Sequence, residues 1–326
     1  MSSENYIPEA GKALELWEQG QIACPVCRKN LQRENIVSLQ MMPCPHCEQM
    51  FFVPKKVDGY FLYEPCGSGG MGSVYKAVSE NYPNQIMALK VLSRQAQQSA
   101  ADIHALLNEA RVSALFSNSD FIISCVDSGF ADGEYFAAMP FTEGERLDKL
   151  LDRLGHLEEK NVLLMALHIL AAEQHIDRLG YLYRDLKPEN VILNQYGYTV
   201  LLDFGLCITR EEAAYNEDEY ISGSPYYIPP ERLLGRGEDA ASEIYSLGMV
   251  MYHALTGKTF FDANEVEALA RRHVSGLRIN STAKMKGLRG SVGILLDAMV
   301  RQEPRERPQD FSYVADSVKA ILQEIG

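Results

Sequence analysis

The sequence predicts an α+β protein with two lobes, preceded by a small cysteine-rich unit. Three observations support this: four cysteines grouped near the N-terminus, strand-like runs from Gly59 to about Met139, and helical patterns from Leu147 onward. A strand-rich half followed by a helix-rich half is typical of the α+β class. The expected parts are a tail with a helix (1–20), the cysteine unit (21–56), and a main domain (57–326) divided into a β-rich lobe (57–141) and a helical lobe (142–326).

The first element is a short helix expected over residues 8–19. Pro8 suits its first position and Gly20 its end. Its apolar face carries Ala10, Ala13, Leu14 and Trp17. Because a single amphipathic helix must cover such a face, we expect it to pack on a neighbouring unit.

The second element is a pair of C-P-x-C sequences separated by sixteen residues. Two such pairs at this spacing are typical of a zinc site, and four thiolates close its coordination, which indicates a structural Zn²⁺. The alternatives are reduced structural cysteines or a redox pair, and His46 is an alternative ligand. The unit resembles a zinc ribbon. Its expected ligands are Cys24, Cys27, Cys44 and Cys47.

The third element is the glycine-rich stretch CGSGGMGSVYKAV, which begins at Cys66. Glycine lets the backbone approach a phosphate closely. The G-x-G-x-x-G pattern also occurs in dinucleotide-binding folds, where a helix follows it. Here a strand-like run follows, which favours a β-hairpin over a nucleotide. The pattern residues are Gly67, Gly69, Gly72 and Val74.

The next run, MALKVL, places Lys90 inside an apolar strand. A strand lysine can simply point outward into solvent. However, the run is apolar on both sides of Lys90, so both faces can be buried, and a lysine there needs an anion. Glu109, in a helix expected at about residues 101–116, can supply that charge; its alternative role is that of a surface glutamate.

The segment GYLYRDLKPENVIL, residues 180–193, has apolar ends and a charged centre. Burying such groups is unfavourable unless they are paired or bound to something. Beyond Asp185 and Asn190, the chain reaches Asp203 at the end of another apolar run. Carboxylate and amide oxygens on successive loops suit Mg²⁺, with phosphate oxygens completing its coordination. The pattern therefore indicates phosphoryl transfer to a hydroxyl group.

Over residues 58–326, the sequence resembles the eukaryotic-type protein serine/threonine kinases, which also occur in bacteria. The ordered segments that carry the resemblance are GSGGMGSV, MALK, the helical glutamate Glu109, YRDLKPEN, DFG, GSPYYIPPE, SEIYSLG and RERP. The resemblance implies a bilobal protein-kinase fold with a β-rich N-lobe and a helical C-lobe. It also implies Mg²⁺- and ATP-dependent phosphorylation of protein substrates, with autophosphorylation.

The resemblance implies a role for each matching residue. The glycine-rich stretch, including Ser68, would cover ATP, and Lys90 would bind its α- and β-phosphates while paired with Glu109. Asp185 would be the catalytic base, and Lys187 would touch the γ-phosphate.

Further implied roles concern the metal and the adenine. Asn190 and Asp203 would bind Mg²⁺. The residues implied to line the adenine pocket are Val74, Ala88, Met139 and Ile192. The residues implied to form the hinge are Pro140, through its carbonyl, and Thr142, through its N–H. The residues implied to form a buried pair that anchors the activation segment, between Gly205 and Pro229, are Glu231 and Arg307.

Three residues depart from the family pattern. Tyr183 stands in place of a histidine, Pro229 in place of an alanine, and Glu243 in place of the aspartate that braces the loop carrying Asp185. None of them handles phosphate or metal, so we expect activity with weakened geometry at Glu243. Lys187 and Ser224 are typical of the serine/threonine group.

The resemblance also suggests how the chain is regulated. Arg184 precedes Asp185, and an activation-segment phosphate would bind it. Ser222 is the best candidate among the hydroxyl residues Thr209, Tyr215, Tyr220, Ser222 and Ser224. The segment also holds the acids Glu211, Glu212, Glu217, Asp218 and Glu219. These either form a solvated loop, repel acidic substrates, or partly occupy Arg184 without phosphate.

Composition limits the partners. The 326-residue chain has a net charge of −13, and its first 57 residues are neutral, so the excess lies in the main domain. This acidic body argues against nucleic acid and anionic lipid, and no apolar run approaches the roughly 18 residues of a membrane span. Seven cysteines without a disulfide pattern, and no apolar signal core, predict a cytoplasmic location.

The expected partners are protein substrates and a docking partner for the ribbon. The alternative function is a nucleotide-binding signalling scaffold that recruits partners through the ribbon. The intact set of Lys90, Asp185 and Asp203, together with Asn190, favours catalysis.

Overall fold

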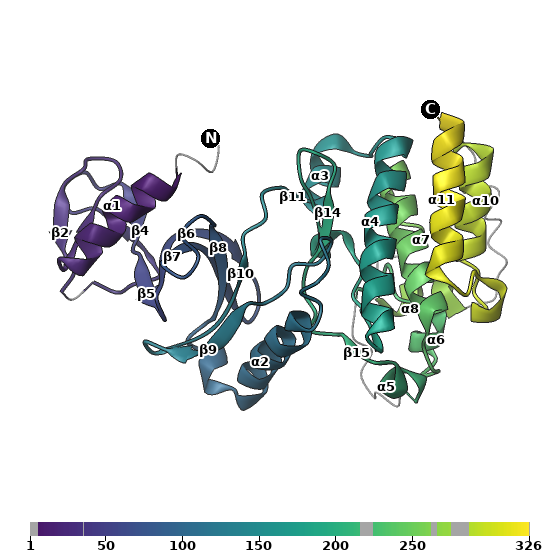
Figure 1. The fold of residues 1–326 in the computed structure, drawn as a ribbon, viewed down its shortest axis with the longest axis horizontal. Coiled ribbons are helices and arrows are strands. Elements are labelled where there is room, and N and C mark those ends of the chain that lie inside the picture. The colour runs from purple at the N-terminus through teal and green to yellow at the C-terminus, as the bar shows by residue number, and fades with distance from the viewer. Residues whose placement is uncertain (1–5, 35, 216–223, 262–265, 275–286, 326) are drawn as a thin grey trace. The chain divides into compact units, whose positions relative to one another are not determined.

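The computed structural model describes residues 6–34, 36–215, 224–261, 266–274 and 287–325. The chain divides by its internal contacts into two units. Unit 1 comprises residues 1–115 and 124–141, and unit 2 comprises residues 116–123 and 142–326. Sheet dominates unit 1 and helix dominates unit 2, which confirms the predicted α+β class (Figure 1).

The main sheet of unit 1 has six antiparallel strands in the order β5-β6-β7-β8-β10-β9. Their bounds are β5 (Lys55–Val57), β6 (Tyr60–Ser68), β7 (Gly72–Ser79), β8 (Met87–Leu92), β9 (Asp127–Ala131) and β10 (Glu134–Pro140). One face buries an aromatic and aliphatic cluster that includes Tyr75, Leu89, Val91 and Phe136. The alternation along β7 and β8 sends the intervening side chains to the opposite face.

A helix covers part of that opposite face. The 3₁₀ turn η2 (Ala96–Gln98) leads into α2 (Ala100–Ala114), close to the expected range. Ser99 caps the helix, because its side chain accepts a hydrogen bond from the backbone N–H of Asp102. Leu106 and Ala110 of α2 pack with Ala137 of β10. The helix is thereby fixed on the sheet together with the glutamate it carries.

The N-terminal helix and the cysteine unit also belong to unit 1. Helix α1 (Tyr6–Glu18) begins two residues before the expected start, and Gly20 follows it with a φ of 76°. Two hairpins then form the cysteine unit: β1 (Gln21–Ala23) with β2 (Asn30–Gln32), and β3 (Met41–Pro43) with β4 (Met50–Phe52). The ring of Trp17 lies 6.1 Å from that of Phe61 on β6, so the helix packs on its neighbour as predicted.

Unit 2 contains two small sheets and most of the helices. One sheet joins β11 (Glu145–Arg146), β13 (Val191–Leu193) and β14 (Thr199–Leu201), and the other joins β12 (Tyr181–Leu182) to β15 (Ile208–Thr209). The segment Phe116–Ile123 belongs here because Ile122 bridges to Leu201.

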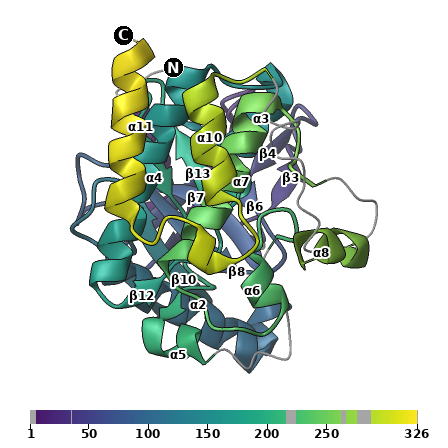
Figure 2. The same cartoon turned by 90° about the vertical axis from the view of Figure 1, so that its right-hand side faces the viewer.

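The helices of unit 2 are α3 (Leu147–Leu154), α4 (Glu159–Arg178), α5 (Arg210–Ala214), α6 (Pro230–Leu233), α7 (Ala240–Thr256), α8 (Val266–Val274), α10 (Gly290–Met299) and α11 (Phe311–Ile325), with the turns η3 (Pro188–Asn190) and η4 (Pro304–Glu306). Helices α4, α7, α10 and α11 pack side by side (Figure 2). Nearly every residue of α7 is buried. Among the helices in the described ranges, none is both long enough and apolar enough to cross a membrane.

Candidate active site

The four cysteines of the N-terminal unit come together as predicted. Their sulfur atoms all lie within 4.8 Å of one another, and two sulfur–sulfur distances, Cys24 to Cys47 and Cys27 to Cys44, are 3.7 Å. Four sulfurs about 2.3 Å from a central Zn²⁺ in a tetrahedron are about 3.8 Å apart, so the arrangement fits that ion. The side chain of His46 is exposed and outside this group.

The four thiols lie close enough to influence one another's ionisation. The backbone N–H of Cys27 lowers the pKa of the Cys24 thiol to about 7. At Cys47, the backbone of Gln49 acts in the same direction, but burial and the three neighbouring sulfurs raise the pKa to about 12. Four adjacent thiolates repel one another, and a divalent cation would remove that repulsion.

In unit 1, the predicted nucleotide residues share one face of the six-stranded sheet. Val74 lies directly opposite Lys90, and Met139 lies opposite Ala88, two residues from Lys90 on the same strand. Residues directly opposite each other in antiparallel strands point to the same side, as do residues two apart in one strand. The four side chains therefore occupy one patch. Pro140 lies on the other side of β10, opposite Met87.

Lys90 has the partner expected for it. Its Nζ donates to Oε2 of Glu109 at 2.7 Å, and both side chains are largely buried. Because α2 is held against the sheet, the glutamate is delivered from a fixed element. Periodicity alone suggested an exposed position for Glu109, and the structure places it half-buried beside the lysine.

The glycine-rich stretch forms the predicted hairpin between β6 and β7. Gly67 pairs with Val74, Ser68 pairs with Ser73, and the N–H of Gly69 donates to the carbonyl of Gly72 at 2.8 Å. A Cβ atom at Gly72 would lie 2.1 Å from the carbonyl oxygen of Val91. Gly72 is therefore required by the close approach of β7 to β8, a packing reason that the sequence pattern did not reveal.

In unit 2, residues 183–190, here called the catalytic loop, surround one buried carboxylate. Oδ2 of Asp185 accepts hydrogen bonds from Nζ of Lys187 at 2.7 Å and from Nδ2 of Asn190 at 2.8 Å. Oδ1 of Asp185 is buried and has no hydrogen-bond partner among the described residues. Burial raises the pKa of Asp185, and the hydrogen bond and charge of Lys187 act against that rise.

A short hairpin brings Asp203 to the catalytic loop. Strands β13 and β14 pair antiparallel, and the N–H of Leu202 donates to the carbonyl of Asn190 at 2.9 Å. Asp203 follows with a φ of 58°, and its Oδ1 accepts a hydrogen bond from the N–H of Gly205. An amide oxygen and an exposed carboxylate on neighbouring loops are donors that Mg²⁺ prefers, so these residues fit that ion.

Two predicted site residues remain, Ile192 and Thr142. Ile192 is on β13, opposite Val200 and Arg146. Thr142 is the first residue of unit 2 after β10.

Two departures from the family pattern have structural explanations. Tyr183 is buried, and its hydroxyl donates to the carbonyl of Leu202, directly before Asp203. Both carboxylate oxygens of Glu243 accept from the N–H of Arg184, at 3.1 and 3.2 Å. The longer side chain therefore braces the catalytic loop. Burial is the largest cause that acts on the pKa of Glu243, and it raises this pKa to about 7.

The predicted anchor of the activation segment is present. Nη1 and Nη2 of Arg307 donate to the two carboxylate oxygens of Glu231 at 2.7 and 2.9 Å. Ser242 donates to Glu231 as well, and all three side chains are buried. This bidentate pair joins α6 to the segment before α11.

Three of the candidate phosphorylation residues lie within the described ranges. Thr209 forms a capping box with Glu212 at the start of α5, and Tyr215 is exposed. Ser224 is half-buried. The favoured phosphorylation residue Ser222, as well as Tyr220 and the acids Glu217, Asp218 and Glu219, lie outside the described residues.

Sequence reasoning missed the partners of Arg184. Its guanidinium binds Glu238, which also binds Arg232. Neither Glu238 nor Arg232 belongs to the motifs that predicted the site. Arg232 follows Glu231 in the run PPERLLG, and a charged pair flanked by prolines and leucines was the available signal.

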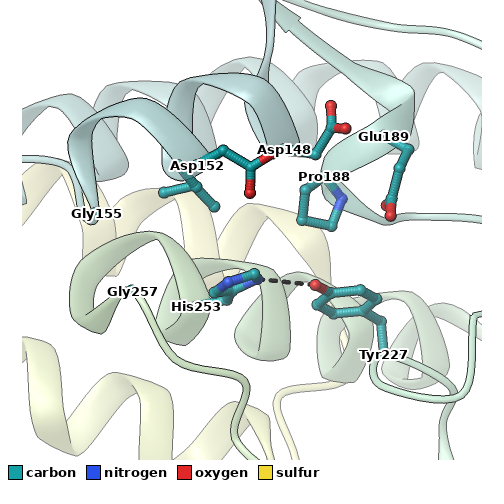
Figure 3. A pocket seen from close by; sticks show the side chains of 9 residues that line it. Asp148, Asp152, Gly155, Pro188, Glu189, Tyr227, His253 and Gly257 are labelled. Atoms are coloured by element: carbon teal, nitrogen blue, oxygen red, sulfur yellow. Dashed lines mark hydrogen bonds between the residues drawn. The ribbon is translucent and has the colours of Figure 1, made fainter.

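A pocket of about 310 Å³ lies beside the catalytic loop (Figure 3). Glu189 of the loop and Asp148 and Asp152 of α3 line one side, and Tyr227 and His253 line the other. The Tyr227 hydroxyl lies 2.8 Å from Nδ1 of His253. Both aspartates are paired with neighbouring basic side chains. Because separate segments supply the lining, no sequence motif marked this pocket.

The chain is similar in sequence to curated serine/threonine-protein kinases of bacteria. The chain is 29% identical over 274 residues to the serine/threonine-protein kinase PknK of Mycobacterium tuberculosis, covering 82% of this chain and 24% of PknK. It is 29% identical over 258 residues to PksC of Streptomyces coelicolor, covering 76% and 46% of the two chains. For pkn3 of Myxococcus xanthus, the values are 27% over 268 residues, 79% and 48%.

This chain thus spans between a quarter and a half of the length of these three curated relatives, each of which is named as a serine/threonine-protein kinase. The family model described as "Protein kinase domain" matches residues 60–320, which is most of the chain. With this match over most of its length, the chain belongs to the protein kinase domain family.

Proposed function

We propose that this chain is a protein serine/threonine kinase that transfers the γ-phosphate of ATP to hydroxyl groups of protein substrates and of itself, with Mg²⁺ as cofactor. The proposal rests on the hydrogen bonding of the two carboxylate oxygens of Asp185. One of its oxygens is held by Lys187 and Asn190, while the other is buried without a partner in the described parts of the chain. A fixed carboxylate with one open oxygen is suited to accept a proton from a substrate hydroxyl.

The proposed phosphate transfer forms one bond to phosphorus and breaks another. The hydroxyl oxygen forms a bond to the γ-phosphorus, and its proton passes to Asp185. The bond between the γ-phosphorus and the oxygen that bridges to the β-phosphate breaks, and ADP leaves with that electron pair. Lys187, whose Nζ lies 2.7 Å from Asp185, places a positive charge where the transferred phosphoryl group carries negative charge.

The other predicted residues would bind the nucleotide and its metal. Lys90, oriented by Glu109, would bind the α- and β-phosphates under the glycine-rich hairpin. Asn190 and Asp203 would hold Mg²⁺, which neutralises phosphate charge when bound. The residues proposed to surround the adenine are Val74, Ala88, Met139, Pro140, Thr142 and Ile192.

The cysteine unit would hold a structural Zn²⁺ through its four thiolates. We assign it a clamping role on the β-rich lobe, because its core is continuous with the sheet of unit 1. Its outer surface would provide the docking site for a protein partner.

The test is transfer of labelled phosphate from Mg·ATP to the chain itself and to a generic basic protein. Asp185→Asn removes the base and is expected to lower the rate about 10²- to 10⁴-fold, the usual contribution of general acid–base catalysis. Asp203→Asn removes a metal ligand and should abolish transfer. Asp316→Asn, an exposed aspartate on α11, changes the charge equally and should leave the rate unchanged.

Equal rates in the parent and the Asp185→Asn variant would contradict the proposed role of Asp185. If the parent bound ATP but transferred nothing to any substrate, including after phosphorylation of the activation segment by another kinase, the nucleotide-binding scaffold would replace the kinase as the better proposal.

A further inference from the structure

The guanidinium of Arg184 already has an anionic partner within the chain. Its Nε and Nη2 both donate to Oε1 of Glu238, at 3.0 and 2.8 Å. The exposed fractions of the two side chains are 7% and 0%. An ion pair this well buried is shielded from water and salt, so it persists under conditions that weaken surface pairs.

The same carboxylate binds a second arginine. Oε2 of Glu238 accepts from Nε and Nη2 of Arg232 at 2.8 and 2.6 Å. Nη1 of Arg232 donates to the carbonyl of Arg184 at 2.6 Å. One carboxylate thus lies between two guanidinium groups, an arrangement that also suits a phosphate. Glu238 and Arg232 together hold both the side chain and the backbone of the residue before Asp185.

Glu238 also joins the activation segment to the catalytic loop. Its backbone N–H donates to the carbonyl of Ala213 in α5 at 3.0 Å. A Cβ atom at Gly237 would lie 2.6 Å from the carbonyl oxygen of Ala214, so only glycine permits this close approach. Strand β15, just before α5, pairs with β12, just before the catalytic loop. The start of the activation segment is therefore folded onto the loop through contacts between the chain's own groups.

We propose that Glu238 is a built-in counterion of Arg184 that positions the catalytic loop in place of a phosphate, so that the chain is active without being phosphorylated. The proposal rests on the proposed kinase function. The expectation that acids of the activation segment, or a phosphate at Ser222, neutralise Arg184 stays a prediction, because Ser222 and three of those acids lie outside the described residues. Glu238 touches neither substrate nor reacting atoms, so it acts as a positioning residue through Arg184.

The first test measures whether Glu238 fills an anion site, and it does not depend on catalysis. Glu238→Gln keeps the shape but removes the carboxylate charge that lies between the two arginines. Inorganic phosphate at tens of millimolar, compared with chloride at equal ionic strength, should raise the unfolding midpoint of this variant by at least about 3 °C more than that of the parent. Glu159→Gln, which removes the partner of the partly exposed Arg289, is the matched control and should respond like the parent.

Equal phosphate responses of Glu238→Gln and the parent would overturn the assignment of an anion site. Glu238→Asp keeps the charge, and its midpoint should respond to phosphate as the parent does. Should Glu238→Gln not fold, the second test decides the proposal with the unmodified chain.

The second test measures activity of the parent after removal of all phosphate by a broad-specificity phosphatase, with mass spectrometry as the check. The initial rate on the generic basic protein should stay within about twofold of the untreated rate and show no lag. A loss of about tenfold or more that rephosphorylation restores would overturn the proposal while leaving the kinase function intact. If no phosphate were transferred before or after the phosphatase treatment, the proposed kinase function would be rejected. The unfolding test with inorganic phosphate would still show whether Glu238 fills an anion site.

A positioning role also predicts a specific kinetic pattern. In Glu238→Gln, kcat should fall while KM for ATP stays unchanged, and added inorganic phosphate should recover part of kcat. A purely structural role for Glu238 would lower the amount of folded protein and would show no such recovery.

Discussion

At the residue scale, two of the buried glutamates of the helical unit, Glu231 and Glu173, are in opposite situations. Glu231 is matched by the bidentate guanidinium of Arg307 and by Ser242. Glu173 on α4 is equally buried, but neither of its carboxylate oxygens has a hydrogen-bond partner among the described residues. A buried charge is tolerated when it is paired and is destabilising when it is alone, so substitutions at the two positions should act in opposite directions.

Glu231→Gln should strongly destabilise the protein. The change leaves the fully buried guanidinium of Arg307 without a counter-charge, and removing one partner of such a pair costs about 3–5 kcal/mol. Urea unfolding of the parent and the variant measures this loss. Glu324→Gln, on the exposed part of α11, is the control. A loss below about 1 kcal/mol would show that Arg307 finds another partner.

Glu173→Leu should stabilise the protein, and more so at high pH. Burial, followed by the charge of Glu243, raises the pKa of Glu173 well above its usual range. The folded state therefore binds a proton more tightly than the unfolded state, and stability from this group falls as pH rises from the unfolded pKa towards the folded pKa. At pH 8 the gain should be about 1–3 kcal/mol.

The measurement is the free energy of unfolding at pH 5, 6.5 and 8 for the parent, Glu173→Leu and Glu173→Gln. The difference between Glu173→Leu and the parent should grow with pH. A difference that is constant across this range would show that Glu173 is not protonated in the folded protein.

At the element scale, the glycine-rich hairpin serves two physical needs. Gly69 and Gly70 have no atom near the position of a Cβ, whereas Gly72 lies against the backbone of β8. The first two have room for a side chain, and the third lets β7 and β8 pair. The two needs can be separated by substitution, because they fall on different glycines.

Gly72→Ala should cost about 1–3 kcal/mol, since overpacking forces a backbone shift between β7 and β8. Gly70→Ala, the matched control, should change stability by less than about 0.5 kcal/mol, because its Cβ meets nothing within 4 Å. Thermal unfolding compares the two. Similar losses in both variants would contradict the separate roles.

At the scale of the whole molecule, the cysteine unit proposed to bind Zn²⁺ is part of unit 1 and not a separate domain. Trp17, Cys44, Phe51 and Val53 share one buried cluster with Phe61 of the main sheet. A pocket of about 330 Å³ is lined by ribbon residues Leu39, Met41 and Phe52, and by Pro65, Gly67, Ser68, Ser73 and Tyr75 of the hairpin. Loss of a bound Zn²⁺ should therefore also affect the parts of unit 1 that contact the cysteine unit.

We expect the parent protein to bind about one zinc ion per chain and Cys44→Ser to bind none. The substitution should also expose Trp17, the chain's single tryptophan. Its fluorescence should shift to longer wavelength, because its ring, now 8% exposed, would lose its contact with Phe61. Cys66→Ser, outside the quartet, should keep both the zinc and the spectrum. Unchanged tryptophan emission after complete zinc loss would show that the helix stays docked without the metal.

The sequence by itself determined the features that depend on short spacing and local periodicity. The two C-P-x-C pairs, the strand-rich and helix-rich halves and the order of the kinase motifs were all predicted. Each is encoded within a few residues, or in a pattern repeated along one element, so no knowledge of distant neighbours was needed.

The resemblance to a family led us to expect the Lys90–Glu109 and Glu231–Arg307 pairs. The tertiary structure alone decided which other distant groups meet. Glu238 binds Arg184 from 54 residues away, Gly72 packs against the carbonyl of Val91, and Trp17 shares a core with Phe61. A charged residue looks the same in the sequence whether it is solvated or buried between two arginines. Its role is set by the burial and long-range pairing that only the folded chain provides.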